Sequence, residues 1–230
     1  MALWTAISAR GSTLNFGSVE EPKKAKEIYA VVQLYGKALN DLYEGRLPKG
    51  WMFGEAANKV YIEMLKDPNK GEQPYTYGQR LHDYLTVDEY DYENEHNEEI
   101  VRYNQLDIAQ IELRSLIDDC VQSNRICGIL WTVSDIILNN PPCFQWFQLR
   151  LSEKNKVSLR ILFRSHDYGN ASFANWGAII RCFVDEVITP AGGELEELIC
   201  VSTSAHIYEN DMDMVESLIG KIPEHIRRMM

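Results

Sequence analysis

Two kinds of residue in the second half of the chain could do chemistry: one cysteine, and the polar residues that end two predicted strands. Cys143 follows two prolines, so its backbone enters the next strand from a stiff turn, which can expose a thiol at a strand edge. The polar clusters are residues 164–167 and 204–208. Because sites are commonly built on loops at strand ends, these segments are the candidates for a binding or catalytic site.

The chemistry open to Cys143 depends on its neighbours. If Arg164 lies close to it, the guanidinium favours the thiolate and lowers the thiol pKa from about 8.5, giving a nucleophile near neutral pH. The alternative is a small buried core cysteine. Arg164 also has a planar fork of donors suited to phosphate, with the Ser165 hydroxyl beside it. The sequence has no Gly-rich phosphate loop of the Walker or dinucleotide-binding type, so ATP and NAD are not indicated.

The order and spacing of the candidate residues are more specific than any one of them. In chain order they are Cys143 after two prolines, Gln148, Arg164, Ser165, Asp167, Asn175, His206 and Tyr208. This arrangement resembles the thymidylate synthase family over roughly residues 123–212, and more weakly upstream through residues 75–78. The forms Arg-Ser-His-Asp and Ser-Ala-His-Ile-Tyr look most like the short branch that includes methanogen-type thymidylate synthases.

The resemblance implies a covalent mechanism. In this family a cysteine thiolate, here Cys143, adds to C6 of a pyrimidine nucleotide and makes C5 nucleophilic enough to take a one-carbon unit. Covalent addition divides a difficult substitution into easier steps. The implied donor is 5,10-methylenetetrahydrofolate or a related reduced pterin, and the leading expectation is methylation of dUMP to dTMP.

The resemblance also implies a phosphate clamp. Arg164 would bind the phosphate and stabilise the thiolate, and Ser165 would add a hydrogen bond. Arg125 corresponds to a family arginine that reaches across the subunit interface, so a homodimer is expected. Asn124 stands where the family usually has a second arginine. Arg10 matches a mobile phosphate-binding arginine only with a gap in the alignment, and the alternative is a plain surface arginine.

The base and the sugar would be read by a second group of residues. The carboxamide of Asn175 can donate to O4 of uracil and accept from N3–H, whereas an aspartate would complement cytosine. Asp167 and Gln148 would support base binding, and His206 and Tyr208 would bind the sugar 3'-hydroxyl. The alternatives are a capping or surface role for Asn175 and ordinary packing for His206 and Tyr208.

The residues that handle protons are less well defined. Tyr77 resembles the tyrosine that assists removal of the C5 proton, with Tyr75 and Tyr84 as nearby alternatives. A general-base glutamate is expected in the N-terminal half, where Glu55 and Glu63 both lie near a predicted helix. Either glutamate can equally be a solvated surface residue.

Two other functions remain open at the level of sequence. In a pyrimidine nucleotide hydroxymethylase acting on dUMP, dCMP or CMP, water rather than hydride captures the one-carbon unit, and the same cysteine and phosphate clamp are needed. Residues 224–230 do not resemble the tail that closes over folate, which weakens the methylation hypothesis. A nucleotide-binding paralogue without turnover is the third possibility, but a mere binder needs no thiol.

Composition sets the broad class. With 230 residues and 45% hydrophobic content, the chain is expected to form one domain over residues 1–230. The 34 acidic side chains exceed the 23 basic ones, so neither nucleic acid nor an anionic membrane is an expected partner. The five cysteines include no Cys-x-x-Cys pair, so neither a metal site nor a redox couple is expected. The sequence shows no signal peptide and no membrane-length apolar run, and a cytoplasmic location is expected.

Hydrophobic periodicity predicts the elements that must position these residues. The predicted helices cover residues 28–42, 55–65, 106–121, 171–188 and 212–219, and the predicted strands cover 126–133, 144–151, 157–163 and 195–204. The acidic stretch 83–99 is expected to be a solvated connection that also covers a site. Grouped helices and strands favour an α+β fold. The family resemblance further implies a mixed, mainly antiparallel sheet flanked by helices, with a dimer formed through the sheet.

Overall fold

The fold is built on one mixed sheet. The computed structural model describes residues 2–17, 22–48, 51, 55–88 and 99–221. Seven strands form the sheet in the order β1-β2-β9-β7-β6-β5, with β8 paired to β9 off this path. The strands are β1 (Ser12–Gly17), β2 (Pro22–Tyr35), β5 (Ser123–Ile129), β6 (Phe144–Leu151), β7 (Lys156–Phe163), β8 (His166–Asp167) and β9 (Glu194–Tyr208). Among the strands of the described residues, only β7 and β8 run parallel to β9, and the other pairings are antiparallel. The α+β class is therefore confirmed.

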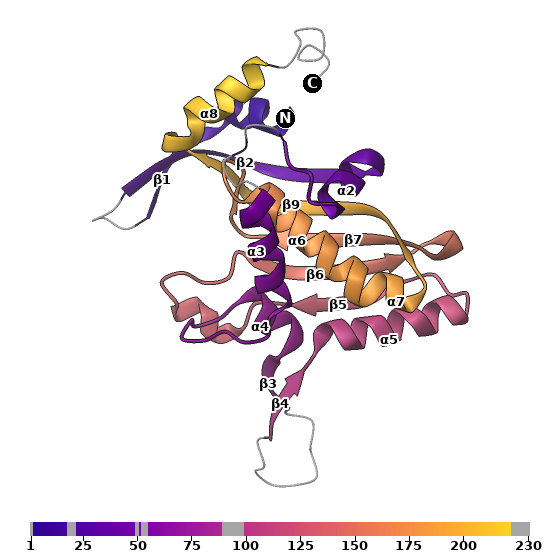
Figure 1. Cartoon of the computed structure of the whole chain (residues 1–230). Coiled ribbons are helices and arrows are strands. Elements are labelled where there is room, and N and C mark those ends of the chain that lie inside the picture. The colour runs from indigo at the N-terminus through magenta and orange to yellow at the C-terminus, as the bar shows by residue number, and fades with distance from the viewer. Residues whose placement is uncertain (1, 18–21, 49–50, 52–54, 89–98, 222–230) are drawn as a thin grey trace.

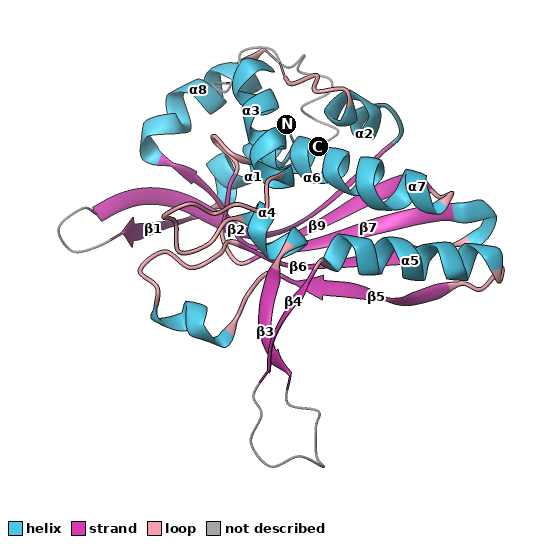
Figure 2. Cartoon of the chain, turned by 60° about the horizontal axis from the view of Figure 1, so that its bottom comes forward, coloured by secondary structure: helices cyan, strands magenta, loops and turns pink. Residues whose placement is uncertain are grey.

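Helices lie along one face of this sheet (Figures 1 and 2). The α-helices are α1 (Ala2–Arg10), α2 (Gly36–Tyr43), α3 (Glu55–Lys66), α4 (Tyr77–His82), α5 (Gln105–Asp118), α6 (Ser172–Phe183), α7 (Thr189–Ala191) and α8 (Glu209–Gly220). Two 3₁₀ turns, η1 (Val133–Ile137) and η2 (Glu153–Asn155), and one π-helical turn, η3 (Val184–Ile188), complete the helical elements. A separate hairpin of β3 (Tyr84–Asp88) and β4 (Glu99–Tyr103) projects from the rest of the chain (Figure 1).

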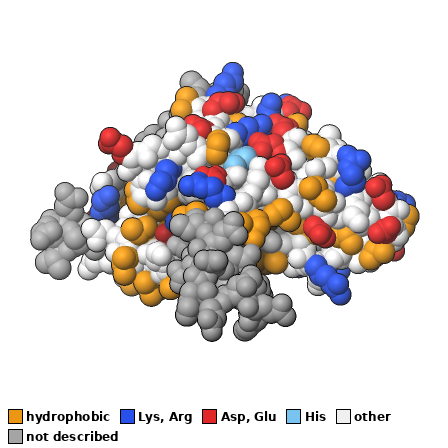
Figure 3. Space-filling model, turned by 90° about the horizontal axis from the view of Figure 1, so that it is seen from below, with side chains coloured by type: hydrophobic (Ala, Val, Ile, Leu, Met, Phe, Trp, Pro, Cys, Tyr) orange, Lys and Arg blue, Asp and Glu red, His pale blue; other side chains and the backbone are white. Residues whose placement is uncertain are grey.

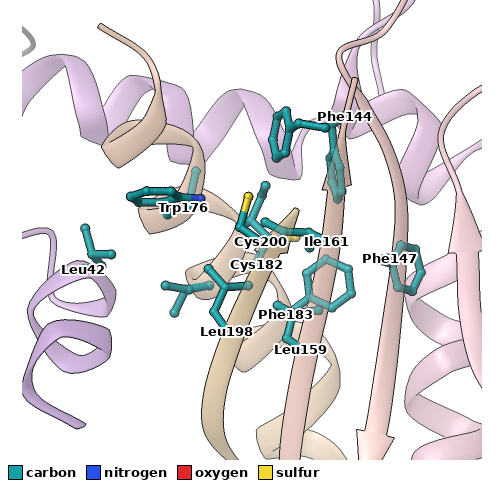
Figure 4. Packing of buried hydrophobic residues seen from close by; sticks show 14 of the residues in the cluster. Leu42, Phe144, Phe147, Leu159, Ile161, Trp176, Cys182, Phe183, Leu198 and Cys200 are labelled. Atoms are coloured by element: carbon teal, nitrogen blue, oxygen red, sulfur yellow. The ribbon is translucent and has the colours of Figure 1, made fainter. Parts of the chain in front are cut away.

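The core lies between the sheet and α6. Leu159 and Ile161 of β7 and Leu198 of β9 are almost fully buried on the face that meets Phe183 of α6 (Figure 4). Alternation along β7 places Val157, Leu159, Ile161 and Phe163 on one face, and burying each large apolar side chain contributes about 1.5–3 kcal/mol. This packing fixes α6 against the strands, and with it the residues that α6 carries toward the candidate site.

Most predicted elements are confirmed, but the predicted helix 28–42 is wrong over most of its length. Residues 22–35 form strand β2, and only α2 is helical. Ile28, Val31 and Val32 are β-branched and suit a strand, and their helical spacing is compatible with a strand that bulges, as β2 does between Ile28 and Ala30. The pairing of β2 with both β1 and β9 outweighs the weak helical periodicity of its apolar residues.

Two further boundaries differ from the sequence prediction. Strand β5 ends at Ile129, whereas the sequence predicted a strand as far as residue 133. Residue 133 instead begins the 3₁₀ turn η1. The acidic stretch 83–99 contains all of β3 and the first residue of β4, and residues 89–98 lie outside the described part of the chain. Within the described residues, no helix combines the length and the hydropathy needed to cross a bilayer.

Candidate active site

Cys143 sits where β6 begins, and Arg164 sits where β7 ends. The backbone N–H of Arg164 donates to the carbonyl oxygen of Cys143 at 2.9 Å. Its guanidinium donates from Nε to the Pro142 oxygen at 3.0 Å and from Nη2 to the Pro141 oxygen at 2.6 Å. Three hydrogen bonds therefore hold the half-buried cysteine beside the arginine, so the proximity expected from the sequence exists.

Arg164 has the expected effect on the thiol, but the net direction of the Cys143 pKa shift is the opposite of the one expected. Burial raises the pKa of Cys143 above the ordinary thiol value, and the charge of Arg164 lowers it by less. Removing a thiolate from water is unfavourable, and this outweighs the attraction of a cation that already donates to two carbonyl groups. In the free chain the thiol form is favoured, and the arginine reduces the penalty of ionisation without abolishing it.

Three tyrosines surround the thiol. The hydroxyl of Tyr77 accepts a hydrogen bond from the backbone N–H of Phe144 at 3.1 Å, next to Cys143. Tyr61 and Tyr75 also lie within electrostatic range of the Cys143 sulfur. Burial is the largest cause that raises the pKa of all three phenols, so they stay protonated near neutral pH and can donate hydrogen bonds.

The structure separates the tyrosine candidates. Tyr77 opens α4, whose N-terminus is capped by Thr76 through a 3.0 Å bond from Gln79 N–H. Tyr75 lies in the same group, whereas the hydroxyl of Tyr84 donates to the Trp131 carbonyl at 3.0 Å. A cavity of about 430 Å³ opens beside the group, lined by Tyr61, Met64, Leu65, Gln73, Pro74, Tyr75, Thr76, Tyr77 and Asn140.

Of the two glutamates considered as a general base, Glu63 is exposed on α3. The side chain of Glu55 lies outside the described residues. Tyr61, on the same helix as both, is the residue that reaches the surroundings of Cys143. Sequence reasoning missed Tyr61 because its place in an amphipathic helix looks like ordinary packing.

A buried ion pair supports the loop that leads to Cys143. Arg80 Nη2 lies 2.7 Å from Asp135 Oδ1, and both side chains are at least nine-tenths buried. Asp135 also accepts from Thr132 N–H at 2.7 Å, which fixes η1, and the guanidinium carbon of Arg80 lies 5.7 Å from the Tyr75 ring centroid. The pair thus ties the η1 loop to α4 and to the tyrosines, a link that sequence analysis missed.

A second group of predicted residues forms where β8 meets β9. Asp167 and His206 are partners in the parallel pairing. Asp167 Oδ1 accepts from the backbone N–H groups of Gly169 at 2.8 Å and Asn170 at 3.0 Å. Burial raises the pKa of Asp167 and lowers that of His206, which therefore favours the neutral imidazole. Nε2 of His206 is buried without a hydrogen-bond partner among the described residues.

Tyr208 connects the two groups. Its ring centroid lies 4.8 Å from that of His206. The ring of Phe16 in β1 packs against the same pair, with its centroid 5.1 Å from that of His206. Burial raises the pKa of Tyr208, and both Asp167 and Cys143 add to the effect through their negative charges. Tyr208 is therefore within electrostatic range of both groups, and Phe16 is a neighbour that the sequence did not reveal.

Asn175 is buried in the first turn of α6, with 8% of its surface exposed. Ala171, not Asn175, is the N-cap residue of this helix. The alternatives of a surface or capping asparagine are therefore wrong. Ser165 is half-buried in the short link between β7 and β8, next to Arg164.

Three predicted residues lie outside these two groups. The amide of Gln148 donates to the Asn124 carbonyl at 2.7 Å, and its oxygen lies 3.4 Å from Nη1 of Arg160, so its described partners belong to neighbouring strands. Arg125 is exposed on the edge strand β5, and Arg10 is exposed at the end of α1. Their assigned roles in substrate binding stay predictions.

The balance between burial and charge at Cys143 predicts its reactivity. Alkylation of Cys143 by iodoacetamide should rise with pH about a midpoint above the ordinary thiol value of about 8.5, because only the thiolate reacts. Arg164→Ala should move the midpoint further up, and Arg164→Lys, which keeps a cation, should move it less. Peptide mass spectrometry would follow the reaction, with Arg150→Ala as the control. A midpoint below the ordinary value would contradict the account.

The Arg80–Asp135 pair predicts a large loss of stability when one partner is neutralised. Asp135→Asn should lower the free energy of unfolding by about 3–5 kcal/mol, because it leaves the Arg80 charge buried and uncompensated. Urea denaturation measures this. Lys37→Ala, which breaks an exposed ion pair with Asp41, should change little and serves as the matched control. Equal small effects of the two substitutions would show that the buried pair is unimportant.

Comparisons with known proteins agree with this geometry. A family model described as thymidylate synthase matches residues 55–230. A protein of Methanosarcina acetivorans named "Putative thymidylate synthase" is 28% identical over 211 residues, covering 90% of this chain and 87% of its own length. Proteins of the same name from Methanosarcina barkeri (27%; 89% and 85% covered) and Methanothermobacter marburgensis (28%; 76% and 69% covered) are also similar. The chain therefore belongs to the thymidylate synthase family and is a one-carbon transferase that acts on a pyrimidine nucleotide.

Proposed function

We propose that this protein methylates dUMP at C5 to give dTMP. The observation that carries the proposal is the position of the Cys143 thiol, held beside the Arg164 guanidinium and within electrostatic range of Tyr77 and Tyr208. A nucleophile, a phosphate-binding cation and phenolic donors are the parts that covalent activation of a pyrimidine nucleotide requires.

The chain's own residues account for the first steps of this reaction. The Cys143 thiolate adds to C6, and the electron pair displaced from the C5–C6 double bond makes C5 nucleophilic. The guanidinium of Arg164 has donors left for the phosphate beyond those given to the two proline carbonyls. Tyr77, at the start of α4, would assist the later loss of the C5 proton. Sγ would leave C6, restoring the C5–C6 double bond, only after the one-carbon unit has been released from the donor and reduced by hydride.

The donor proposed for this reaction is 5,10-methylenetetrahydrofolate or a related reduced pterin, which supplies the carbon and, for methylation, the hydride. The cavity of about 430 Å³ beside the tyrosines suits a flat heterocycle, because Tyr61, Pro74 and Tyr75 line it. Of these residues, Tyr61 and Tyr75 also lie within electrostatic range of the thiol. A donor bound there would lie next to the activated base.

Hydroxymethylation is the second candidate, and the same tyrosines favour it. The phenols of Tyr61, Tyr75 and Tyr77 stay protonated and could hold a water molecule near the one-carbon unit. Water would then capture that unit in place of hydride, and the donor would not be oxidised. Methylation requires that the closed site exclude this water.

A homodimer through the sheet would complete the phosphate site. The face of the sheet opposite the helices carries apolar side chains that are exposed in the single chain, including Val31 (57%), Tyr35 (66%) and Ile129 (49%). Strand register places Val31 beside Val201 and Ile129 beside Trp146 on this same face. A broad exposed apolar surface is typical of a protein interface. Arg125, on the same edge strand as Ile129, would reach the partner's phosphate site.

Product analysis tests the proposed reaction. Purified protein with dUMP and methylenetetrahydrofolate should give a product heavier by one methyl group, together with dihydrofolate, and Cys143→Ala should give none. A hydroxymethyl product without folate oxidation would select the second candidate. Parallel reactions with dCMP and CMP show the base and sugar preference, and no product from any nucleotide would contradict both candidates.

Substitution of the proposed base reader should change which base is used. Asn175→Asp should lower kcat/KM for dUMP by roughly 10²-fold or more and make dCMP the better substrate, because a carboxylate cannot donate to O4. Steady-state kinetics with both nucleotides measure this change. Asn69→Asp is the matched control, because its exposed side-chain oxygen accepts from Gly71 N–H with either residue. Unchanged discrimination between uracil and cytosine would remove Asn175 from the role.

Mixing two inactive chains tests whether Arg125 acts across the interface. Arg125→Ala and Cys143→Ala dimers should each be weakly active or inactive, because every site lacks one part. Random exchange of subunits should restore about a quarter of the wild-type sites, since a mixed dimer holds one complete site. Activity measured after brief partial denaturation and refolding of the mixture reports this. If Arg125 acts within its own chain, mixing restores nothing.

A further inference from the structure

A second cluster of reactive side chains lies where α4 meets the end of α6 and η3. His82 comes from α4, Cys182 from α6 and Glu186 from η3. One donor atom from each lies within 4.8 Å of the others. None of these residues belongs to the group around Cys143. We refer to them as the His82–Cys182–Glu186 cluster.

The orientation of the His82 ring is informative. Its Nδ1 lies 2.9 Å from the carbonyl oxygen of Gly78, and a carbonyl can only accept, so Nδ1 carries a proton. Its Nε2 lies 2.8 Å from Oε2 of Glu186. In a neutral imidazole with its proton on Nδ1, the lone pair of Nε2 would face a lone pair of the Glu186 carboxylate. Nε2 must therefore either carry a second proton or face a cation.

The other two donors come from adjoining helical turns and share one face of the helix. Cys182 and Glu186 are four residues apart, and Sγ lies 3.9 Å from Oε1 of Glu186 across the start of η3. π-helical turns are rare and are frequently found at functional sites. Cys182 is fully buried, whereas the side chain of Glu186 is 29% exposed and gives access from solvent. Thiolate, imidazole and carboxylate together are a donor set typical of zinc.

We propose that the His82–Cys182–Glu186 cluster binds one Zn²⁺ ion, with water as the fourth ligand. The ion would bond to Nε2 of His82, Sγ of Cys182 and a carboxylate oxygen of Glu186. It replaces two protons, one from Sγ–H and one from the protonated Nε2, and both pass to solvent. The Gly78 carbonyl then fixes the tautomer and the orientation of the ring, as second ligand shells commonly do.

The charges around the cluster are compatible with a divalent ion. A thiolate and a carboxylate together neutralise Zn²⁺. Nζ of Lys66 competes for Glu186 at 4.0 Å, but it lies closer to Asp185 Oδ2, at 3.0 Å, and that carboxylate retains it. Tetrahedral zinc needs its donors about 3.3–3.8 Å apart, which rotation of the partly exposed Glu186 side chain can reach. On the face shown in Figure 3, a histidine lies beside acidic and basic side chains.

The ion would act as a structural clip. It would join α4, whose first residue is Tyr77, to α6, which carries Asn175. Such a clip would fix two walls of the candidate active site from outside it and would not take part in the reaction. The sequence predicted no metal site, because the three ligands are far apart along the chain and follow no metal-binding motif.

Cobalt is the probe for this site, because Co²⁺ replaces zinc and reports thiolate ligation by a charge-transfer band in the near ultraviolet. Titration of the metal-free full chain should give this band at one Co²⁺ per chain, and Zn²⁺ should abolish it by competition. Cys182→Ala and His82→Ala should each lose the band, while Cys127→Ala, which removes an exposed cysteine, should keep it. His82→Ala leaves the core cysteine in place, so the test stands even if Cys182→Ala fails to fold.

Thermal unfolding and Co²⁺ affinity provide two further measurements of the site. Zn²⁺ should raise the midpoint of thermal unfolding of the wild-type chain and leave that of His82→Ala unchanged. Lys66→Met should tighten Co²⁺ binding severalfold, because it removes the competing cation. No band at excess Co²⁺, or a band that survives His82→Ala, would overturn the proposal and leave the cluster as a protonated His82–Glu186 ion pair.

Discussion

The hydrogen bonds between Arg164 and residues 141–143 are the constraint on which the candidate site depends. They join the end of β7 to the turn that leads into β6. One arginine therefore holds the backbone next to the cysteine and also acts on its thiol electrostatically. The two strands are neighbours in the sheet and are packed from one side by α6. The position of the nucleophile is therefore set by rigid elements, and not by a loop alone.

The same arrangement limits the chemistry. Burial that excludes water from the reaction also makes the Cys143 thiolate harder to form, and each pKa unit corresponds to about 1.4 kcal/mol. Arg164 offsets part of this penalty, while the protonated phenols of Tyr61 and Tyr77 supply hydrogen-bond donors close by. Substrate must therefore complete the site, because the free chain holds its nucleophile mainly in the unreactive form. A dimer that brings Arg125 to the phosphate would add a further cation.

Sequence reasoning reached the fold class and most elements because period-2 and helical patterns are local. Strand β7 and helix α6 show such patterns clearly, whereas Ile28, Val31 and Val32 satisfy both periods, and only pairing with β1 and β9 decides between them. The residues brought together around Cys143 came from a resemblance in order and spacing, not from periodicity. Sequence patterns do not give the burial of Cys143. For that reason the predicted direction of its net pKa shift was wrong.

Contacts between distant segments could not be foreseen where the family resemblance does not reach. Arg80 meets Asp135 across 55 residues, and His82 meets Glu186 across 104. Each of these residues is ordinary where it stands in the sequence. Tyr61 looks like one more residue of an amphipathic helix until α3 is packed against α6. Such contacts depend on how the helices are placed over the sheet, which local patterns do not specify.

Covalent trapping tests the central claim most directly. 5-Fluoro-dUMP should react at the proposed nucleophile but cannot complete the cycle, because fluorine at C5 does not leave as the proton does. With methylenetetrahydrofolate present, the peptide containing Cys143 should gain the mass of nucleotide plus folate. Cys143→Ala should show no adduct, and Cys127→Ala should trap normally. An adduct on another cysteine, or none on the folded wild-type chain, would contradict the assignment of Cys143 as the nucleophile.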